Sequence, residues 1–348
     1  MRCVPLSILL QKYRRKCQFL GKPVLQSEGK SDMLDIKTGR PALAVHPYAL
    51  GQLIVYSYTR KEIFMGKNVI ETDLTGKVAV VTGASGTLCS VFCIALANAG
   101  AKVALLGRNL GKLNELAAKI EAEGGVAKGY ACNVLSKDNC IAVAEQVQED
   151  LGPCDILING AGGNNSRANT DKEFFEMPDL DDDTVTFFDL DENSVQNVFN
   201  LNWVGTLLPT QAFARQMVGR EGCNILNISS MNAYTPLTKI PAYSASKAAV
   251  TNFTQWLAVH FSKVGIRVNA IAPGFFAAEQ NAKLLFNDDG TPTARTEKIL
   301  AATPMGRFGD SQKDLVGSIL FLLNNDAAGF ITGITLPIDG GFSAYSGV

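Results

Sequence analysis

The sequence predicts an α/β protein in which a single parallel sheet carries helices on both faces. Short apolar runs that end in small or polar residues alternate with segments of helical periodicity, and this alternation continues through most of the chain. The composition agrees with this prediction, because 47% hydrophobic and 19% charged residues in a chain of 348 are typical of a globular protein.

The elements alternate from Lys77 onward. The first strand is the apolar run 78–81, which ends at Thr82-Gly83, and apolar residues at helical spacing follow over 89–99 until Gly100 ends the helix. The same patterns predict strands at 102–106, 129–133, 155–159, 223–229, 267–271 and 334–338, and helices at 110–123, 136–151, 194–219, 243–264 and 310–323. Because βα units connect by right-handed crossovers, we expect a doubly wound nucleotide-binding sheet, the Rossmann fold. Residues 65–348 contain no linker and are predicted to form one domain.

Residues 1–64 differ from the rest of the chain in charge. They hold 11 Lys and Arg against four Asp and Glu, whereas residues 65–348 hold 21 against 29. An apolar run precedes the basic cluster, which is the wrong order for a signal peptide, so a start-site error, another targeting segment and a genuine extension are the alternatives. We favour a start at Met65, because Lys61-Glu62 can be encoded by a ribosome-binding sequence at a suitable distance upstream. In each case we expect this basic N-terminal extension to be poorly ordered.

Composition argues against several classes of function. A net charge of −1 gives no overall field that attracts nucleic acid or anionic lipid, and no apolar run reaches the roughly 20 residues that span a bilayer. The two histidines, His46 and His260, lie in unrelated surroundings, which argues against a multi-histidine metal site. The eight cysteines form no C-x-x-C pair and are predicted to be reduced thiols of a cytoplasmic protein. We therefore expect no nucleic-acid, membrane or metal partner.

The strongest chemical signal is Tyr243-Ser-Ala-Ser-Lys247, with Ser230 thirteen residues before the Tyr. Tyr and Lys four residues apart on a helix share one face, and a nearby ammonium stabilises a phenolate, which lowers the pKa of the Tyr and lets it exchange protons. Ser230 lies just past a predicted strand, where its hydroxyl would hold a substrate oxygen beside Tyr243. A Tyr-Lys pair by itself is common on surface helices, so this interpretation depends on its register with the other motifs.

Four other motifs lie where a nucleotide-binding sheet needs them. The turn between Thr82 and Cys89 is rich in small residues that let the backbone approach a pyrophosphate, and the run 155–162 is an apolar strand that ends in Asn-Gly-Ala-Gly, against which an adenosine ring can lie. Asn202 is a polar residue in the middle of an apolar helix, where it either holds a water or satisfies a neighbouring carbonyl. The run 269–274 ends in Pro-Gly at the carboxyl edge of the sheet, where such folds bind ligands.

Together these motifs resemble the short-chain dehydrogenase/reductase family over residues 74–341. The resemblance implies an enzyme in which Tyr243 is the acid/base and Ser230 positions the substrate oxygen. Lys247 would bind the nicotinamide ribose and lower the pKa of the Tyr, and Asn202 would anchor a proton-relay water. The predicted cofactor-binding residues are Gly83, Ser85, Gly86, Leu88, Arg108, Asn133, Val134, Asn159, Ala161, Gly162, Tyr243, Lys247, Pro273, Gly274 and Phe276.

The departures from the family pattern bear on the cofactor. Thr87 and Cys89 stand where the second and third glycines of the phosphate motif are usual, and Asn133 replaces an adenine-contacting Asp. The end of the second strand has Gly107 where an NAD-selecting acid would stand, and Arg108 beside it would pair with a 2′-phosphate or stack on the adenine. NADP is therefore favoured over NAD. The altered glycine motif leaves a cofactor-binding regulator without turnover as an alternative from a different class.

The substrate is indicated by a closer resemblance, to the D-mannonate oxidoreductase (fructuronate reductase) branch of the family. The runs that carry this resemblance are 159–165, 229–233, 236–243, 273–276 and 339–348. It implies interconversion of D-fructuronate and D-mannonate. Gluconate 5-dehydrogenase or another keto-uronate reductase is the alternative, and a reductase of acyl carriers or steroids is disfavoured if the loops around the nicotinamide are polar.

Polar side chains on those loops are the predicted substrate contacts. They are Asn164, Arg167, Asn232, Lys239 and Gln280. Arg167 or Lys239 would meet the carboxylate of a sugar acid. The acidic stretch 171–192 is either a lid or, as we expect, a solvated loop. A homodimer or homotetramer built on the helices at 194–219 and 243–264 is the family expectation.

Overall fold

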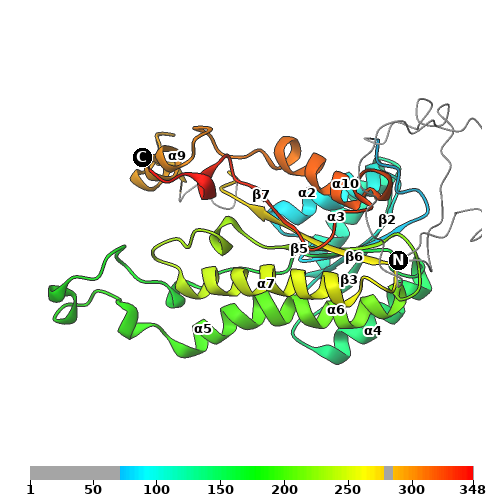
Figure 1. Cartoon of the computed structure of the whole chain (residues 1–348), viewed down its shortest axis with the longest axis horizontal. Helices are drawn as coiled ribbons and strands as arrows, with labels where there is room; N and C mark the ends of the chain where they lie inside the picture. The colour runs from blue at the N-terminus through cyan, green and yellow to red at the C-terminus, as the bar shows by residue number, and fades with distance from the viewer. Residues whose placement is uncertain (1–70, 278–284, 348) are drawn as a thin grey trace, which may run out of the picture. The chain divides into compact units, whose positions relative to one another are not determined.

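The structure, a computed structural model, describes residues 71–277 and 285–347. Its centre is a seven-stranded sheet in the order β3-β2-β1-β4-β5-β6-β7, and every neighbouring pair is parallel (Figure 1). The strands are β1 (Val78–Thr82), β2 (Lys102–Gly107), β3 (Val126–Ala131), β4 (Ile156–Asn159), β5 (Cys223–Ile228), β6 (Ile266–Pro273) and β7 (Thr335–Ile338). The chain runs to one edge through β3 and returns to the middle at β4, so the strand order reverses between β1 and β4. The predicted doubly wound parallel sheet is confirmed.

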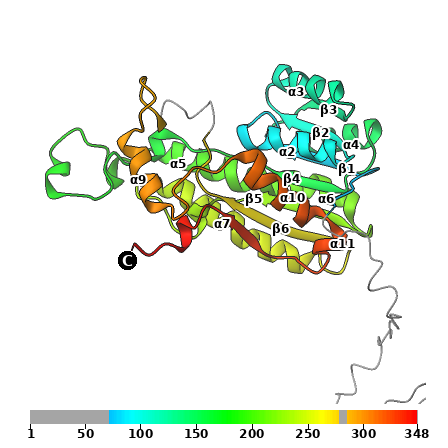
Figure 2. The ribbon, with the colours of Figure 1, turned by 90° about the horizontal axis from the view of Figure 1, so that it is seen from above.

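Helices cover both faces of the sheet (Figures 1 and 2). They are α2 (Thr87–Asn98), α3 (Leu110–Ala122), α4 (Lys137–Asp150), α5 (Glu192–Phe199), α6 (Gly205–Met217), α7 (Pro241–His260), α9 (Ala294–Ala302), α10 (Val316–Leu323) and α11 (Asn325–Ala328). In one core cluster, Phe92 of α2 and Ile319 of α10 pack against one face of the sheet. In a second cluster, Phe213 of α6 and Leu257 of α7 pack against the other face. Successive residues of β1 belong alternately to the two clusters, because side chains alternate across a strand. This two-sided burial explains why the central strands are continuous apolar runs.

Several elements differ from the prediction, among them the helix predicted at 310–323, which begins with a π-helical turn at Ser311–Leu315 before α10. β3 begins at Val126 instead of 129, because it is an edge strand whose residues alternate between exposed and buried and so form no apolar run. The helix predicted at 194–219 is interrupted by a π-helical turn at Asn200–Val204. The amphipathic helix α9 was not predicted, since its sequence is mostly polar or charged on the exposed side. The basic extension 1–64 lies outside the described residues.

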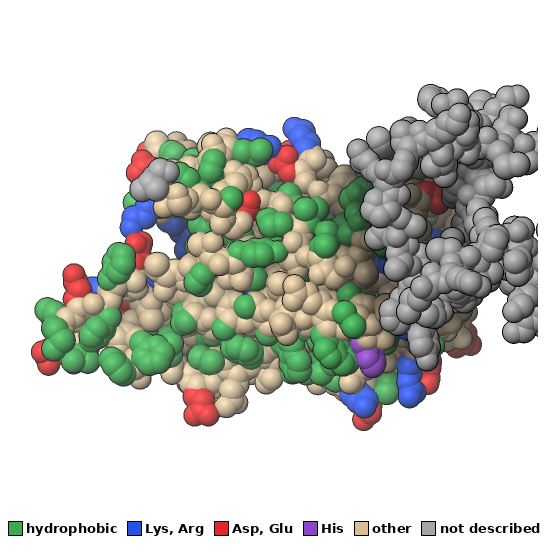
Figure 3. Space-filling model, viewed as in Figure 1, with side chains coloured by type: hydrophobic (Ala, Val, Ile, Leu, Met, Phe, Trp, Pro, Cys, Tyr) green, Lys and Arg blue, Asp and Glu red, His purple; other side chains and the backbone are tan. Residues whose placement is uncertain are grey.

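The acidic stretch predicted to be a solvated loop is an ordered excursion between β4 and α5. Its short turns at Met177–Leu180 and Phe187–Asp189 are each closed by a capping box. Phe187 and Phe188 are 69% and 70% exposed, and Phe188 packs edge-on against Phe175 with a centroid separation of 5.8 Å. The loop lies at the left in Figures 1 and 3, where its apolar side chains gather among the carboxylates. It is solvated as expected, but it also exposes aromatic rings.

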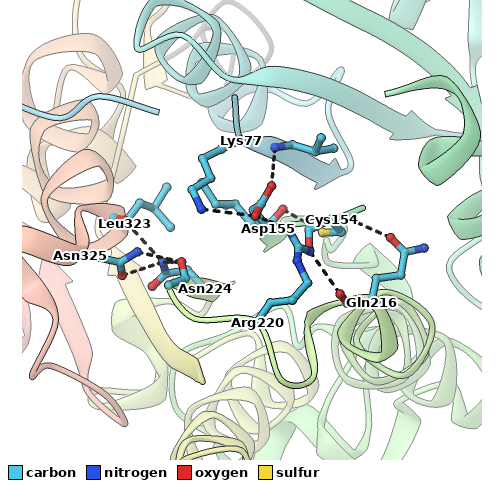
Figure 4. A network of polar contacts seen from close by, with 11 residues as sticks. Lys77, Cys154, Asp155, Gln216, Arg220, Asn224, Leu323 and Asn325 are labelled. Carbon is cyan, nitrogen blue, oxygen red and sulfur yellow. Dashed lines mark hydrogen bonds and ion pairs between the residues drawn. The ribbon is translucent and has the colours of Figure 1, made fainter. Parts of the chain in front are cut away.

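The amino edge of the sheet is held by an ion network around Asp155, just before β4 (Figure 4). This buried carboxylate accepts hydrogen bonds from the backbone N–H of Val78 at 2.9 Å and from the Arg220 guanidinium at 2.5 Å, and Lys77 lies 3.4 Å away. It thereby ties β1, β4 and the turn after α6 together at the edge opposite the predicted site. Within the described ranges, no helix is long and apolar enough to cross a membrane.

Candidate active site

The predicted site residues follow the carboxyl ends of β1, β4, β5 and β6. Because these four strands are parallel neighbours, their ends meet at one edge of the sheet. The strand order reverses beside β1, and such a reversal opens a crevice in which doubly wound folds bind ligands. The sheet therefore brings loops together that are far apart in the sequence.

Ser230, Tyr243 and Lys247 come together at this edge. Ser230 follows β5 and accepts a hydrogen bond from the N–H of Asn232 at 3.3 Å, and its hydroxyl lies close enough to the Tyr243 phenol to lower the pKa of that phenol. Tyr243 lies in the first turn of α7, and the Lys247 ammonium, one turn later, is 5.7 Å from the centre of its ring. The same ammonium donates to the carbonyl of Ile228, at the end of β5, at 2.8 Å. A proton-exchanging phenol, a hydroxyl and a cation thus share one small volume.

The charge state of this group differs from the prediction in one respect. Burial lowers the pKa of Lys247 to about 8, so this ammonium loses its proton at a lower pH than an exposed lysine. Burial also raises the pKa of the Tyr243 phenol, and the hydrogen bond from Ser230 opposes that rise only in part. The prediction that Lys247 lowers the pKa of Tyr243 is therefore not met in the protein alone, because desolvation of the phenol is the larger effect.

Asn202 lies in the π-helical turn between α5 and α6 and is fully buried. Its amide nitrogen donates to the carbonyls of Gly163 and Val198, both at 2.8 Å, and its oxygen accepts from the N–H of Gly163 at 3.1 Å. π-helical turns are frequent at functional sites. With these hydrogen bonds, the Asn202 side chain satisfies neighbouring carbonyls, and its role in holding a water stays a prediction.

The phosphate turn after β1 is shaped by close backbone contacts. Gly83 has φ +66°, and a Cβ there would lie 2.9 Å from the Cα of Ala161. Gly86 begins α2 without a side-chain cap, whereas Asn109 and Ser136 cap α3 and α4 with their side chains. The start of α2 thus carries no side-chain cap, and helix N-termini in glycine-rich turns of this kind are the places where nucleotide-binding folds hold phosphate.

Cys89 is accommodated by a glycine on the neighbouring strand end. A Cβ at Gly160 would lie 2.2 Å from the Cys89 sulfur, so the thiol occupies the space that a side chain at residue 160 would need. The usual close packing of helix against strand is kept although the third glycine of the motif is absent. The hydroxyl of Thr82 holds the same strand end, accepting from the N–H of Gly160 at 3.0 Å and of Ala161 at 3.1 Å.

A cleft of about 820 Å³ runs from this turn past the ends of β2 and β3. Eight of the predicted cofactor residues line it: Gly83, Ser85, Gly86, Arg108, Asn133, Val134, Ala161 and Gly162. Lys112, in the first turn of α3, also lines it and was missed, although it stands only four residues after Arg108. None of the described lining residues is acidic. The glycine cradle, the uncapped helix and the two cations fit an extended dinucleotide phosphate.

Other predicted cofactor residues have different surroundings. Leu88 packs against the core cluster that contains α2. The Asn159 side chain turns into the protein, where it donates to the Thr210 hydroxyl at 3.0 Å and to Asn227 at 2.8 Å. The side chain thus braces β4 against α6 and β5, and cofactor binding at residue 159 stays a prediction.

The predicted cofactor residues at the carboxyl end of β6 also pack against neighbouring parts of the protein. Pro273 pairs with Ile338 of β7, and Gly274 approaches Asp339 so closely that a Cβ would lie 2.6 Å from its Cα. The ring of Phe276 covers the backbone of Gly309.

The predicted substrate residues do not form one group. Asn164 donates to Asn169 at 3.0 Å on the surface, and Arg167 is exposed in the turn Ser166–Ala168. Asn232 is buried beside Ser230, with no hydrogen-bond partner for its side-chain oxygen in the described part of the chain. Lys239 lines a pocket with α9, a helix that the sequence did not reveal. Gln280 lies outside the described residues.

Comparisons with known proteins identify the class. A family model described as short chain dehydrogenase matches residues 77–288. An uncharacterized oxidoreductase of Haemophilus influenzae is 56% identical over 276 residues, which cover 79% of this chain and 96% of the relative. The chain therefore belongs to the short chain dehydrogenase family, and it is an oxidoreductase that acts on alcohol groups with a nicotinamide cofactor.

Two solved structures are similar to this chain and have more specific descriptions than the family model. A crystal structure of a proposed D-mannonate oxidoreductase from Haemophilus influenza, with bound NAD, is 55% identical with a TM-score of 0.77, covering 81% of this chain and 100% of that one. A gluconate 5-dehydrogenase from Burkholderia cenocepacia, in complex with NADP and tartrate, is 26% identical with a TM-score of 0.67, covering 80% and 100%. The first agrees with the branch resemblance drawn from the sequence.

Proposed function

We propose that this enzyme interconverts a 5-keto sugar acid and its hydroxy acid. Among such pairs, we propose D-fructuronate and D-mannonate as its substrates. The observation that carries the proposal is the meeting of three side chains at one edge of the sheet: Ser230 acts on the pKa of the buried Tyr243 phenol, and the Lys247 ammonium lies 5.7 Å from the centre of the phenol ring. This arrangement suits proton transfer to a carbonyl oxygen at the carboxyl edge of the sheet. The likeness to a proposed D-mannonate oxidoreductase supports the choice of substrate.

When bound, the nicotinamide supplies or accepts the hydride. The glycine turn from Gly83 to Gly86 and the first turn of α2 would hold its pyrophosphate, and the Lys247 ammonium would bind its ribose. At the other end of the cleft, Arg108 and Lys112 would meet the adenosine ribose. Two cations without an acidic neighbour favour a 2′-phosphate, so we propose NADP as the preferred cofactor.

In carbonyl reduction, Ser230 holds the substrate oxygen and Tyr243 donates its proton to that oxygen. The raised pKa keeps the phenol protonated until the oxygen develops charge, because burial disfavours the phenolate. Asn202 holds the loop at Gly163 beside this centre, and we include a proton relay through a water at Asn202 in the proposal. In the reverse direction, Tyr243 accepts the proton of the hydroxyl.

The test is oxidation of NADPH and NADH, followed at the nicotinamide absorbance band, with D-fructuronate, 5-keto-D-gluconate and a keto-deoxy-uronate. We expect the highest kcat/KM with D-fructuronate, and a loss of about 10²–10⁴-fold in Tyr243→Phe while the nucleotide still binds. A higher kcat/KM with 5-keto-D-gluconate would identify the alternative, a gluconate 5-dehydrogenase. Nucleotide binding without turnover of any of the three acids would refute the proposal.

The cofactor preference is tested separately with Arg108→Ala and Lys112→Ala. We expect the KM for NADPH to rise about tenfold in each, with that for NADH unchanged, because a charged hydrogen bond to the phosphate is lost. A wild-type enzyme that prefers NADH, or variants that affect both nucleotides equally, would favour NAD.

The assembly and compartment belong to the same proposal. Trp203, Phe253 and Trp256 form a stack along α7 with centroid separations of 5.8 and 6.2 Å, yet Trp256 is 56% and Val259 76% exposed. Figure 3 shows apolar side chains along this face. We propose that it is buried in a homodimer or homotetramer, which mass photometry tests; a monomer at micromolar concentration contradicts it.

The six described cysteines are buried and free, which supports a reducing, cytoplasmic compartment.

A further inference from the structure

The inference concerns how a sugar acid is recognised, and it rests on the proposed function. A sugar acid differs from a neutral ketose by its carboxylate, which needs a cation in the substrate pocket. Lys247 is not available for this purpose, because it is buried and donates to the Ile228 carbonyl. Arg167, one of the two cations predicted for the role, is exposed on a turn that lines none of the pockets described above.

Three cations surround a pocket of about 310 Å³ between α9 and the segment that leads into α7. Lys239 contributes from that segment, and Arg295 and Lys298 contribute from successive turns of α9. Apolar walls are provided by Ile299 and by Phe275, which follows β6. The pocket thus has the mixed lining of a small-ligand site, with an excess of positive charge.

The polar partners of these cations show what the pocket attracts. The Lys298 ammonium lies 2.7 Å from a carboxylate oxygen of Glu173, and the Lys239 ammonium donates to the backbone carbonyl of Asp171 at 2.6 Å. Arg295 makes no ion pair with any described residue. Glu173 comes from the acidic loop and is the single carboxylate among the described residues that line the pocket. One internal carboxylate therefore faces three cations.

The pocket lies one helical turn from the proposed proton donor. Ile240, which lines it, is the N-cap of α7, and Tyr243 is three residues further along the same helix. In a 5-keto sugar acid, four carbon–carbon bonds separate the carbonyl carbon from the carboxylate carbon. That span is close to the pitch of one helical turn, about 5.4 Å. Because the pocket borders the N-cap of the helix that carries Tyr243, it is the place that we assign to the carboxylate of a substrate whose carbonyl meets Tyr243.

We propose that Arg295 and Lys298, assisted by Lys239, form the subsite that binds the substrate carboxylate. Glu173 occupies this subsite as an internal competitor and is displaced when the sugar acid binds. The acidic loop thereby senses the substrate, since release of Glu173 breaks its ion pair with α9. The three cations make the enzyme specific for acids over neutral ketoses.

Substitutions of opposite expected effect test this subsite. In Arg295→Gln and Lys298→Gln we expect the KM for D-fructuronate to rise about tenfold with kcat nearly unchanged, because a charged hydrogen bond to the carboxylate is lost. In Glu173→Gln we expect that KM to fall about threefold, because the competitor loses its charge. None of the three should change kinetics with the methyl ester of the same keto acid, which is neutral, and Lys119→Gln on α3 is the matched surface control.

Binding of D-mannonate to the protein with reduced nucleotide, a pair that cannot react, is measured by calorimetry and separates this inference from the proposed function. Binding that weakens tenfold in the Arg295→Gln, Lys298→Gln double variant supports the subsite, even if D-fructuronate is not turned over. Equal binding by the double variant and the wild type overturns the subsite and leaves the proposed reaction standing. A wild-type protein that binds no sugar acid overturns it as well, as does a Glu173→Gln variant whose KM rises.

Discussion

Gly162 touches both the cofactor cleft and the catalytic group, which makes Gly162→Ala the most informative single substitution. A Cβ at this position would lie 2.6 Å from the Asn202 side-chain oxygen and 3.2 Å from the Lys247 ammonium. Neighbouring Gly163 offers a matched control, because a Cβ there would meet only Leu201, at 3.8 Å. Neither glycine has a positive φ, so the comparison isolates the steric effect.

The magnitude follows from the bonds that hold Asn202. An ordinary contact begins near 3.4 Å, so the Asn202 amide would have to move by about 0.8 Å. Its hydrogen bonds with Gly163, at 3.1 and 2.8 Å, would be lost or distorted, each costing about 1 kcal/mol, and overpacking in a buried site adds about 1–3 kcal/mol. We expect the free energy of unfolding to fall by about 3–5 kcal/mol. Displacement of Lys247 should lower kcat/KM at least tenfold.

The assay is urea unfolding followed by far-UV circular dichroism, together with steady-state kinetics, on both variants. Gly163→Ala should stay within about 1 kcal/mol of the wild type or become slightly more stable, because alanine reduces the entropy of the unfolded chain. If Gly162→Ala unfolds at the same urea concentration as Gly163→Ala, the contact with Asn202 is not restrictive and the reasoning is refuted.

Three further predictions follow from the same contacts. Gly160→Ala should lower the free energy of unfolding by about 2 kcal/mol, because the new Cβ would lie 2.2 Å from the Cys89 sulfur. Adding Cys89→Ala should restore part of that stability, and additive effects of the two substitutions would contradict this coupling. Asp155→Ala should cost about 3 kcal/mol in the same urea assay while leaving kcat/KM unchanged, since it unpairs Arg220 at the edge away from the site; lost activity in the folded variant would argue otherwise. Burial lowers the pKa of Lys247 from 10.5 to about 8, so the unfolded chain binds the proton more tightly and the free energy of unfolding should rise between pH 8 and 10. Lys247→Met should abolish that rise, and a rise that persists in it must come from another group.

The local features of this protein were predictable because they depend on neighbours in the sequence. Buried strands are continuous apolar runs, so β1, β2, β4 and β5 were predicted to within one or two residues. Tyr243 and Lys247 share a helical face through their spacing alone. The edge strand β3 and the polar helix α9 have weaker patterns, and they are the elements that were misplaced or missed.

By itself, then, the sequence predicted the fold class and the family and singled out Ser230, Tyr243 and Lys247 as candidate catalytic residues, because each of these predictions depends on periodicity or on the order of motifs along the chain. Only the tertiary structure decided how distant segments meet. It paired Cys89 with Gly160, it turned Asn159 away from the cleft, and it brought Glu173 to Lys298 across 125 residues. It also reversed the expected shift in the pKa of Tyr243, because desolvation depends on everything packed around the phenol and no spacing in the sequence reports it.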